Sequence, residues 1–219
     1  MINLNRLKKE DILKRHFFKC VHGHTGLEHP QCYDQANNEK EKIAFFDIET
    51  SNLKSNWGFV FSYCIKELDG KIIKRILTPE EIKSGIYDKD LLGQFCKDIR
   101  QFDRIIGYYS ARFDVPFLRT RCVYYGLDFP IFKEIKHNDL YDILKRKFNL
   151  HSKRLGVVAE FFKIPAKEHK MNPNIWFSAM AGNKKALDWI MTHNIEDVNT
   201  TETLWKRVNQ YSNLTNSSI

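Results

Sequence analysis

Hydrophobic and polar positions divide the chain near residue 40 into a short polar part and a longer part with strand and helix patterns. Residues 4–18 carry an amphipathic pattern that predicts a short helix. Residues 19–41 are poor in aliphatic side chains, which predicts a loop with little core of its own. We therefore treat residues 1–40 as an extension of the main domain, which we expect to span residues 41–211.

Strand patterns come first in the longer part, and helix patterns alternate with strands further along. Residues 42–48 form an apolar run bounded by charge, which predicts a buried central strand. Residues 58–66 and 71–77 predict two further strands, joined by a hairpin turn at Asp69 and Gly70. The remaining predicted elements are a helix over 88–102, a strand over 104–108, a helix over 114–125, a short strand within 133–140, helices over 140–149 and 153–163 (the second capped by Ser152), and a last helix from an Asn183 cap to about 210. This order predicts an α/β fold with helices covering a mixed sheet, followed by a polar tail over 212–219.

Two carboxylates stand at the end of the predicted central strand, in the triplet Asp47-Ile48-Glu49. Side chains alternate along a strand, so Asp47 and Glu49 point to the same face. Two acids this close repel each other, and such a pair persists where a cation lies between them. Oxygen ligands of this kind suit Mg²⁺ or Mn²⁺. The alternative is a solvated turn that holds no ion.

Further candidate groups follow on two later elements. Asp114 comes after the loop that contains Gly107 and stands where a helix begins, so it is either a ligand or only the cap of that helix. His193 and Asp197 are four residues apart on the last helix and share a face, as in a site or in a solvated ion pair. Glu196 lies about 100° round the helix from Asp197 and does not align with His193.

Three segments carry these residues in a fixed order: FFDIETSNL (45–53), IIGYYSARFDVPFLRTRC (105–122) and HNIEDVNTTETLW (193–205). Together they resemble the DEDD superfamily of 3′→5′ exonucleases. The resemblance covers about residues 43–208. It implies a ribonuclease H-like fold, in which a mixed five-stranded sheet is flanked by helices, here with a small N-terminal Cys/His extension.

The resemblance also implies roles for the matching residues. Asp47, Glu49 and Asp197 hold one Mg²⁺ or Mn²⁺ ion. Asp47 bridges to a second ion, which Asp114 supports. Two such ions stabilise the attacking and the leaving oxygen of an in-line displacement. His193 orients or deprotonates the attacking water, as a neutral imidazole can at physiological pH.

Two positions depart from the family pattern. One branch of the family has Tyr-x-x-x-Asp and another has histidine at a longer spacing, whereas this chain has His193 at the tyrosine spacing from Asp197. Because one residue rotates a helical side chain by about 100°, His193 approaches the water differently from either branch. The family often has asparagine two residues after the glycine of the second motif, and here that residue is Tyr109.

Cysteine and histidine cluster within thirteen residues of the N-terminal extension, at Cys20, His22, His24, His29 and Cys32. Two cysteines and two of the three histidines suit a tetrahedral structural zinc site. Cys20, His24, His29 and Cys32 are one ligand set, and His22 is the alternative to His24. Without a metal, the segment is a flexible, histidine-rich loop.

Charge points to a polyanionic partner. The 219 residues carry a formal net charge of +8, and cations that contact phosphates release counterions on binding. Arg112, Arg119 and Arg121 flank the second motif and are candidates for phosphate contacts. The resemblance places Thr50 and Leu53 near a 3′ terminus.

A second basic stretch, over residues 133–170, is either a track for single-stranded nucleic acid or a solvated helix face. No apolar run approaches the roughly 20 residues that span a bilayer, and the first residues lack a signal-peptide core. The five cysteines are odd in number and widely spread, which favours a reducing, intracellular compartment over secretion.

These observations predict a metal-dependent 3′→5′ exonuclease that acts on nucleic-acid 3′ ends, with DNA favoured over RNA and single-stranded ends favoured. A polymerase or repair protein is a candidate partner. The alternative is a nucleic-acid-binding or protein-docking subunit of a replication or repair assembly with the same fold.

Overall fold

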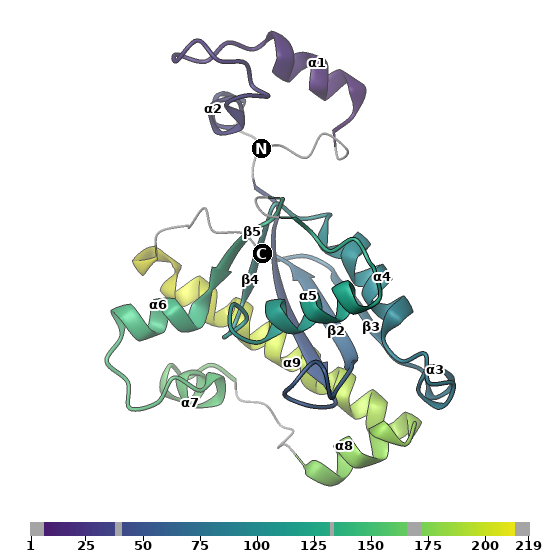
Figure 1. Ribbon diagram of the computed structural model, residues 1–219. Helices are drawn as coiled ribbons and strands as arrows, with labels where there is room; N and C mark the ends of the chain where they lie inside the picture. The colour runs from purple at the N-terminus through teal and green to yellow at the C-terminus, as the bar shows by residue number, and fades with distance from the viewer. Residues whose placement is uncertain (1–6, 38–40, 132–133, 166–171, 213–219) are drawn as a thin grey trace.

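A mixed five-stranded sheet forms the centre of the larger part of the chain (Figure 1). The computed structural model describes residues 7–37, 41–131, 134–165 and 172–212. Across the sheet the strands stand in the order β3 (Ile72–Ile76), β2 (Val60–Glu67), β1 (Ile43–Thr50), β4 (Arg104–Gly107) and β5 (Lys136–Asp139). The three strands β1 to β3 pair antiparallel, whereas β4 and β5 run parallel to β1. The predicted meander and its hairpin turn at Asp69 are confirmed.

The central position of β1 follows from its sequence. Successive residues Phe45 and Phe46 are both buried, so the strand has a hydrophobic neighbour on each face. Phe46 packs in the core that contains helices α4 (Lys89–Ile99) and α5 (Asp114–Tyr124). Phe45 packs in a second core with α6 (Leu140–Lys147), α7 (Leu155–Phe161) and part of α9 (Lys184–Val208). Figure 1 shows α4 and α5 on one face of the sheet and α9 crossing the other.

The long helix α9 is fixed to the sheet by polar contacts as well as by its apolar side. Asn183 accepts a hydrogen bond from the backbone of Ala186 at 3.1 Å, so the predicted cap is confirmed. The buried Asn194 side chain donates to Ser62 Oγ on β2 at 3.2 Å. Further along, Lys66 pairs with Glu202 at 2.7 Å. These contacts with β2 fix which face of α9 is turned toward the sheet.

Several shorter helices differ from the sequence predictions. The extension holds α1 (Lys9–Phe17) and also α2 (Pro30–Ala36), so the prediction of a loop throughout residues 19–41 is wrong. Helices α3 (Pro79–Lys83) and α8 (Pro173–Met180) were not predicted, and a 3-10 turn (Asn209–Tyr211) ends the described chain. The unpredicted helices α2, α3 and α8 each begin with proline and have at most eight residues, so they are too short to show a clear helical repeat. Ser152 does not cap α7, whose N-cap is Arg154.

The N-terminal module, defined as residues 7–37, lies beyond the end of the sheet at which β1 begins (Figure 1). The predicted residues 4–6 of the first helix, and residues 213–219 of the polar tail, fall outside the described residues. Among the helices of the described ranges, none is long and apolar enough to cross a membrane.

Gly107, at the end of β4, is so closely packed that a substitution there tests the packing of the fold. A Cβ atom at Gly107 would lie 2.5 Å from Ser110 Cβ and 2.9 Å from the Phe46 ring. Ser110 has little freedom to move, because its hydroxyl is hydrogen-bonded to the buried His137 ring at 2.8 Å. We expect Gly107→Ala to lower the free energy of unfolding by about 1–3 kcal/mol, measured by urea denaturation.

The matched control is Gly93→Ala. Gly93 lies inside α4, and a Cβ atom there meets nothing within 4 Å. Because alanine favours helix over glycine, this substitution should stabilise the protein by about 0.5–1 kcal/mol. Equal effects of the two substitutions would contradict the packing described at Gly107.

Candidate active site

The carboxylates of β1 face the helix that carries the last motif. Phe45, two residues before Asp47, packs in the core under α9, so Asp47 and Glu49 point to that same side. The register of β1 against β2 shifts between Glu49 and Thr50, which ends the regular pairing at the acids. Asn194 on α9 donates to the backbone oxygen of Asp47 at 3.4 Å, so the helix and the strand end are held together.

Glu49, His193 and Asp197 form a compact group. Their ligand atoms all lie within 4.8 Å of one another. The Nε2 atom of His193 lies 3.8 Å from a Glu49 oxygen and 3.9 Å from an Asp197 oxygen. The expected sharing of one helix face by His193 and Asp197 is thus seen in the structure, and Glu196 is not a member of the group.

Two tryptophans hold the His193 ring in place, and neither is among the residues predicted from the sequence. Trp189 stacks on the ring with centroids 5.0 Å apart and planes at 14°. Trp176 meets it edge to face at 6.1 Å and donates its indole N–H to the Thr50 oxygen at 3.1 Å. Trp189 could have been found, since it stands one helical turn before His193. Trp176 lies on the unpredicted helix α8 and had no such signal.

Asp114 sits at the start of α5, deep against β1. Its side chain is 3% exposed, and its Oδ1 accepts the backbone N–H of Ile48 at 3.2 Å. The pKa of Asp114 is raised to about 7, first by burial and also by the charges of Asp139 and Asp197, while hydrogen bonds from backbone N–H groups act to lower it. Asp114 is therefore placed between Asp47 and Glu49 along the strand and interacts electrostatically with Asp197. It lies outside the compact group of Glu49, His193 and Asp197.

Asp139 fixes the conformation of the loop that precedes Asp114. One of its oxygens accepts the Tyr109 N–H at 2.8 Å and the other accepts the Ala111 N–H at 3.0 Å. It also caps α6 by accepting the Tyr141 N–H at 3.0 Å. Tyr109 has a positive φ of 60°, a conformation that asparagine adopts more readily than tyrosine. The bond from Asp139 therefore holds the residue at which this chain departs from the family pattern.

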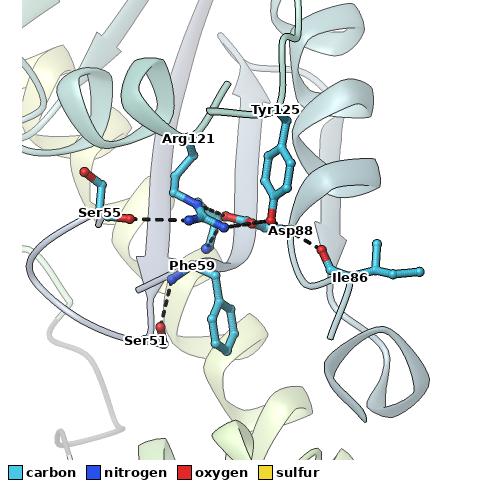
Figure 2. A network of polar contacts seen from close by, with 8 residues as sticks. Ser51, Ser55, Phe59, Ile86, Asp88, Arg121 and Tyr125 are labelled. Atoms are coloured by element: carbon cyan, nitrogen blue, oxygen red, sulfur yellow. Dashed lines mark hydrogen bonds and ion pairs between the residues drawn. The ribbon is translucent and has the colours of Figure 1, made fainter. Parts of the chain in front are cut away.

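The loop after Glu49 is anchored by a buried carboxylate, Asp88 (Figure 2). Asp88 accepts the backbone N–H of Val60 at 2.9 Å and two guanidinium bonds from Arg121, at 2.6 and 3.0 Å. Arg121 also donates to the Ser55 oxygen in that loop at 3.4 Å, and to the Tyr125 hydroxyl at 2.8 Å. Arg121 thus ties the loop to α5. Its described contacts hold the fold together, and none of them places the guanidinium for a phosphate contact.

The other expected substrate residues have mixed surroundings. Thr50 is buried and donates its hydroxyl to the Asn52 oxygen at 2.9 Å, whereas Leu53 is 77% exposed. Arg112 is partly exposed but pairs with Asp142 at 2.8 Å. Arg119 is exposed on α5, with its guanidinium over the Phe129 ring.

A shallow pocket of about 630 Å³ lies beside the Tyr109 loop. Basic and aromatic side chains line it, namely Tyr108, Tyr109, Tyr141, His151, Lys153 and Arg154. The Tyr108 hydroxyl donates to the Lys153 oxygen at 2.6 Å, which joins the loop to the segment before α7. The stretch that was a candidate basic track in the sequence therefore borders an open pocket.

The expected zinc ligands lie in the N-terminal module, away from these acids (Figure 1). The structure gathers Cys20, His22, His29 and Cys32, so His22 rather than His24 completes the cluster. All five cysteines of the chain are free of disulfides.

Comparison with known proteins agrees with this architecture. A sequence model of the RNase_H superfamily matches residues 44–209. Curated proteins give no match. Among solved structures, the chain is similar to the family B DNA polymerase from the hyperthermophilic archaeon Pyrobaculum calidifontis, with a TM-score of 0.64 and 21% sequence identity. That similarity covers 78% of this chain and only 25% of the polymerase chain, and it shows a shared fold. Together with the five-stranded sheet, these matches confirm the expected ribonuclease H-like fold.

The buried acid Asp114 makes a testable contribution to stability. Its folded-state pKa of about 7 lies above the ordinary value of 3.8, so its favourable contribution is present below pH 3.8 and is lost as the pH rises to about 7. In EDTA, we expect Asp114→Asn to be more stable than the wild type by about 2–4 kcal/mol at pH 8, with a difference that shrinks toward pH 4. Urea denaturation at several pH values measures this.

Two comparisons sharpen the test. Mn²⁺ should raise the unfolding midpoint of the wild type more than that of Asp114→Asn. Asp188→Asn removes an exposed acid paired with Lys184 on α9 and should show neither effect. A stability difference for Asp114→Asn that does not vary with pH would contradict the raised pKa.

Proposed function

This chain belongs to the RNase_H superfamily, and we propose that it is a metal-dependent 3′→5′ exonuclease that hydrolyses phosphodiester bonds at nucleic-acid 3′ ends. One observation carries the proposal: Glu49 of β1 and His193 and Asp197 of α9 have ligand atoms within 4.8 Å of one another, beside the strand position where Asp114 of α5 bonds to Ile48. With Asp47 on β1, these residues form the proposed site. They belong to the three segments that resemble DEDD exonucleases.

The donor set fits hard divalent cations. Glu49 and Asp197 lie close together and partly buried, and Asp114 is an acid whose ionised form is unfavourable without a positive partner. Asp47, Glu49 and Asp197 would hold one Mg²⁺ or Mn²⁺ ion, and Asp47 with Asp114 would hold a second. Bound ions of this kind supply charge stabilisation for the attacking and leaving oxygens of an in-line displacement.

His193 is proposed to position the attacking water. Its ring is buried and held by Trp189, so the direction of its Nε2 atom is fixed toward Glu49 and Asp197. A neutral imidazole in that position accepts a proton from water as the water attacks phosphorus. The stack with Trp189 restricts rotation of the ring, which keeps that acceptor in place.

Substrate contacts are proposed on both sides of the acids. The exposed Leu53 would contact the terminal base, and Arg119 would contact backbone phosphate. Arg112 would first have to leave Asp142. The pocket beside Tyr109 and Lys153 suits bases that stack on tyrosine while cations approach the phosphates, which is how proteins bind single strands. We favour DNA over RNA because the sequence resembles polymerase proofreading domains.

The nuclease assay is direct. Full-length protein is incubated with 3′- and 5′-labelled single- and double-stranded DNA and RNA in Mg²⁺, Mn²⁺ or EDTA. We expect stepwise shortening from the 3′ end, abolished by EDTA and reduced by about 10²-fold or more in Asp47→Ala, because transition-state charge loses its support.

Asp188→Ala, which removes an exposed acid of α9, should retain the wild-type rate. Activity that survives Asp47→Ala would refute the mechanism. Tight binding of single-stranded DNA without cleavage under any metal condition would favour the alternative, a binding subunit of a replication or repair assembly.

The proposed role of His193 predicts a separate effect on kcat and on Mn²⁺ affinity. His193→Ala should lower kcat by about 10²-fold while Mn²⁺ affinity stays near the wild-type value, because a water-positioning group acts on the rate and not on the metal. Thr192→Ala, at the neighbouring exposed position, is the control. A near-normal kcat would show that another group handles the water. A parallel loss of Mn²⁺ affinity would instead make His193 a metal ligand.

A further inference from the structure

Four side chains of the N-terminal module surround one point in space. Each sulfur lies at nearly the same distance from each of two imidazole nitrogens: Cys20 Sγ is 3.7 Å from His22 Nδ1 and from His29 Nδ1. Cys32 Sγ is 3.7 Å from His22 Nδ1 and 3.8 Å from His29 Nδ1. The described residues therefore contain a compact Cys₂His₂ cluster that plays no part in the proposed nuclease reaction.

These distances match the edges of a zinc tetrahedron. A Zn–S bond of about 2.3 Å and a Zn–N bond of about 2.0 Å, at the tetrahedral angle, place sulfur and nitrogen about 3.5 Å apart. Hydrogen bonding alone does not account for the arrangement. Each thiol has one proton to donate, and each Nδ1 atom takes part in one hydrogen bond. Two thiols and two rings can therefore form two S–N hydrogen bonds, whereas the structure has four S–N contacts of nearly equal length. One central ion satisfies all four atoms at once.

The backbone prepares the two halves of the cluster separately. In the first half, the Cys20 N–H bonds to the His24 oxygen at 3.0 Å and the Gly23 N–H bonds to the Cys20 oxygen at 2.9 Å. Gly23 has a φ of 81°, which a glycine adopts without strain. This tight turn brings the side chains of Cys20 and His22 to the same side.

The second half stands at the start of α2. Glu28 accepts the N–H of Thr25 at 2.7 Å, and the His29 N–H bonds to the Thr25 oxygen at 2.8 Å. His29 and Cys32 are three residues apart as the chain enters the helix, so they lie on one side of it. Turn and helix thus each supply one sulfur and one nitrogen.

The module has little else to hold it together. Its buried contacts centre on Tyr33, which packs edge to face on Phe18 and lies under the guanidinium of Arg15 at 4.3 Å. Arg15 also pairs with Asp34 at 2.8 Å. So small a core rarely stabilises a fold of about 30 residues, and natural domains of this size add a metal or disulfides.

We propose that Cys20, His22, His29 and Cys32 bind one structural Zn²⁺ ion whose binding folds the N-terminal module. Four protein ligands close the coordination shell, so the ion has no open position for substrate. His24 is not a ligand: its ring packs against the His29 ring at 4.6 Å, on the outside of the cluster.

The zinc centre is separate from the carboxylates. The module joins the main domain at the start of β1, whereas Glu49 lies near the end of that strand. Six residues of strand span about 20 Å, so the two metal centres lie at opposite ends of β1. Loss of zinc should therefore unfold the module without removing the acids from their positions.

Metal analysis of the full-length protein, purified without chelators, should find about one zinc per chain. Removing that zinc and adding Co²⁺ should produce the visible absorption of a tetrahedral ion and the near-ultraviolet charge-transfer band of thiolate ligands. Cys20→Ser combined with Cys32→Ser should lose both signals. Absence of zinc from the full-length protein, together with Co²⁺ spectra of an octahedral ion, would overturn the proposal.

The two histidines provide a matched pair. His22→Ala should weaken zinc binding by about tenfold or more in competition with a chromophoric chelator, whereas His24→Ala should bind zinc as the wild type does. The Co²⁺ spectrum of the wild-type protein tests the coordination geometry without any substitution, so the proposal remains testable even if a variant fails to fold. Retention by His22→Ala with loss in His24→Ala would overturn the ligand set. Nuclease activity does not enter either measurement, so the zinc site and the proposed function are tested independently.

Discussion

Repulsion between acids at the end of β1 is the constraint to which the surrounding structure responds. Glu49 and Asp197 approach each other across the interface of β1 and α9, and the buried Asp114 interacts with Asp197 from the other side of the strand. Burial makes each charge costlier, because a carboxylate gives up its water. The fold therefore has to hold these groups in place against their mutual repulsion, by contacts with other parts of the chain.

Two of these contacts are hydrogen bonds from uncharged groups. The backbone N–H of Ile48 fixes Asp114, and Asn194 fixes α9 to β1 through the backbone of Asp47. The nearby Arg121 pairs with the buried Asp88 and so holds the loop that follows Glu49. The positions of the acids thus result from a rigid frame, which is the condition for a metal site that keeps its geometry when the ion leaves.

The sequence allowed much of this frame to be predicted because its signals are local. The buried run of β1, the Asn183 cap and the four-residue spacing of His193 and Asp197 each depend on near neighbours in the chain. Trp176 could not be found in this way, because its contacts with His193 and Thr50 join residues far apart in sequence. The position of Arg121 beside the second motif predicts a contact with phosphate, whereas in the fold Arg121 is bonded to Asp88, which lies far from it in the sequence.

The two candidate metal centres of the chain use opposite chemistry. The cluster of the N-terminal module combines sulfur and nitrogen in a closed set supplied by a turn and a helix start. The acids of β1, α5 and α9 offer oxygen and come from segments that are far apart in the sequence. The Cys/His cluster lies within one short segment, so its candidate residues could be proposed from their spacing in the sequence. The choice between His22 and His24 depends on the turn at Gly23, which only the structure shows.

The burial of Asp114 also bears on how such a chain evolves. Stability and activity make opposite demands at this position, since a neutral side chain would suit the metal-free fold better than an acid does. A lineage that kept the fold only as a scaffold would face no selection against replacing Asp114 and would gain from doing so. Drift in a chain without catalysis should therefore replace this acid early, so the residue at position 114 in related chains is expected to separate active members from those that keep only the fold.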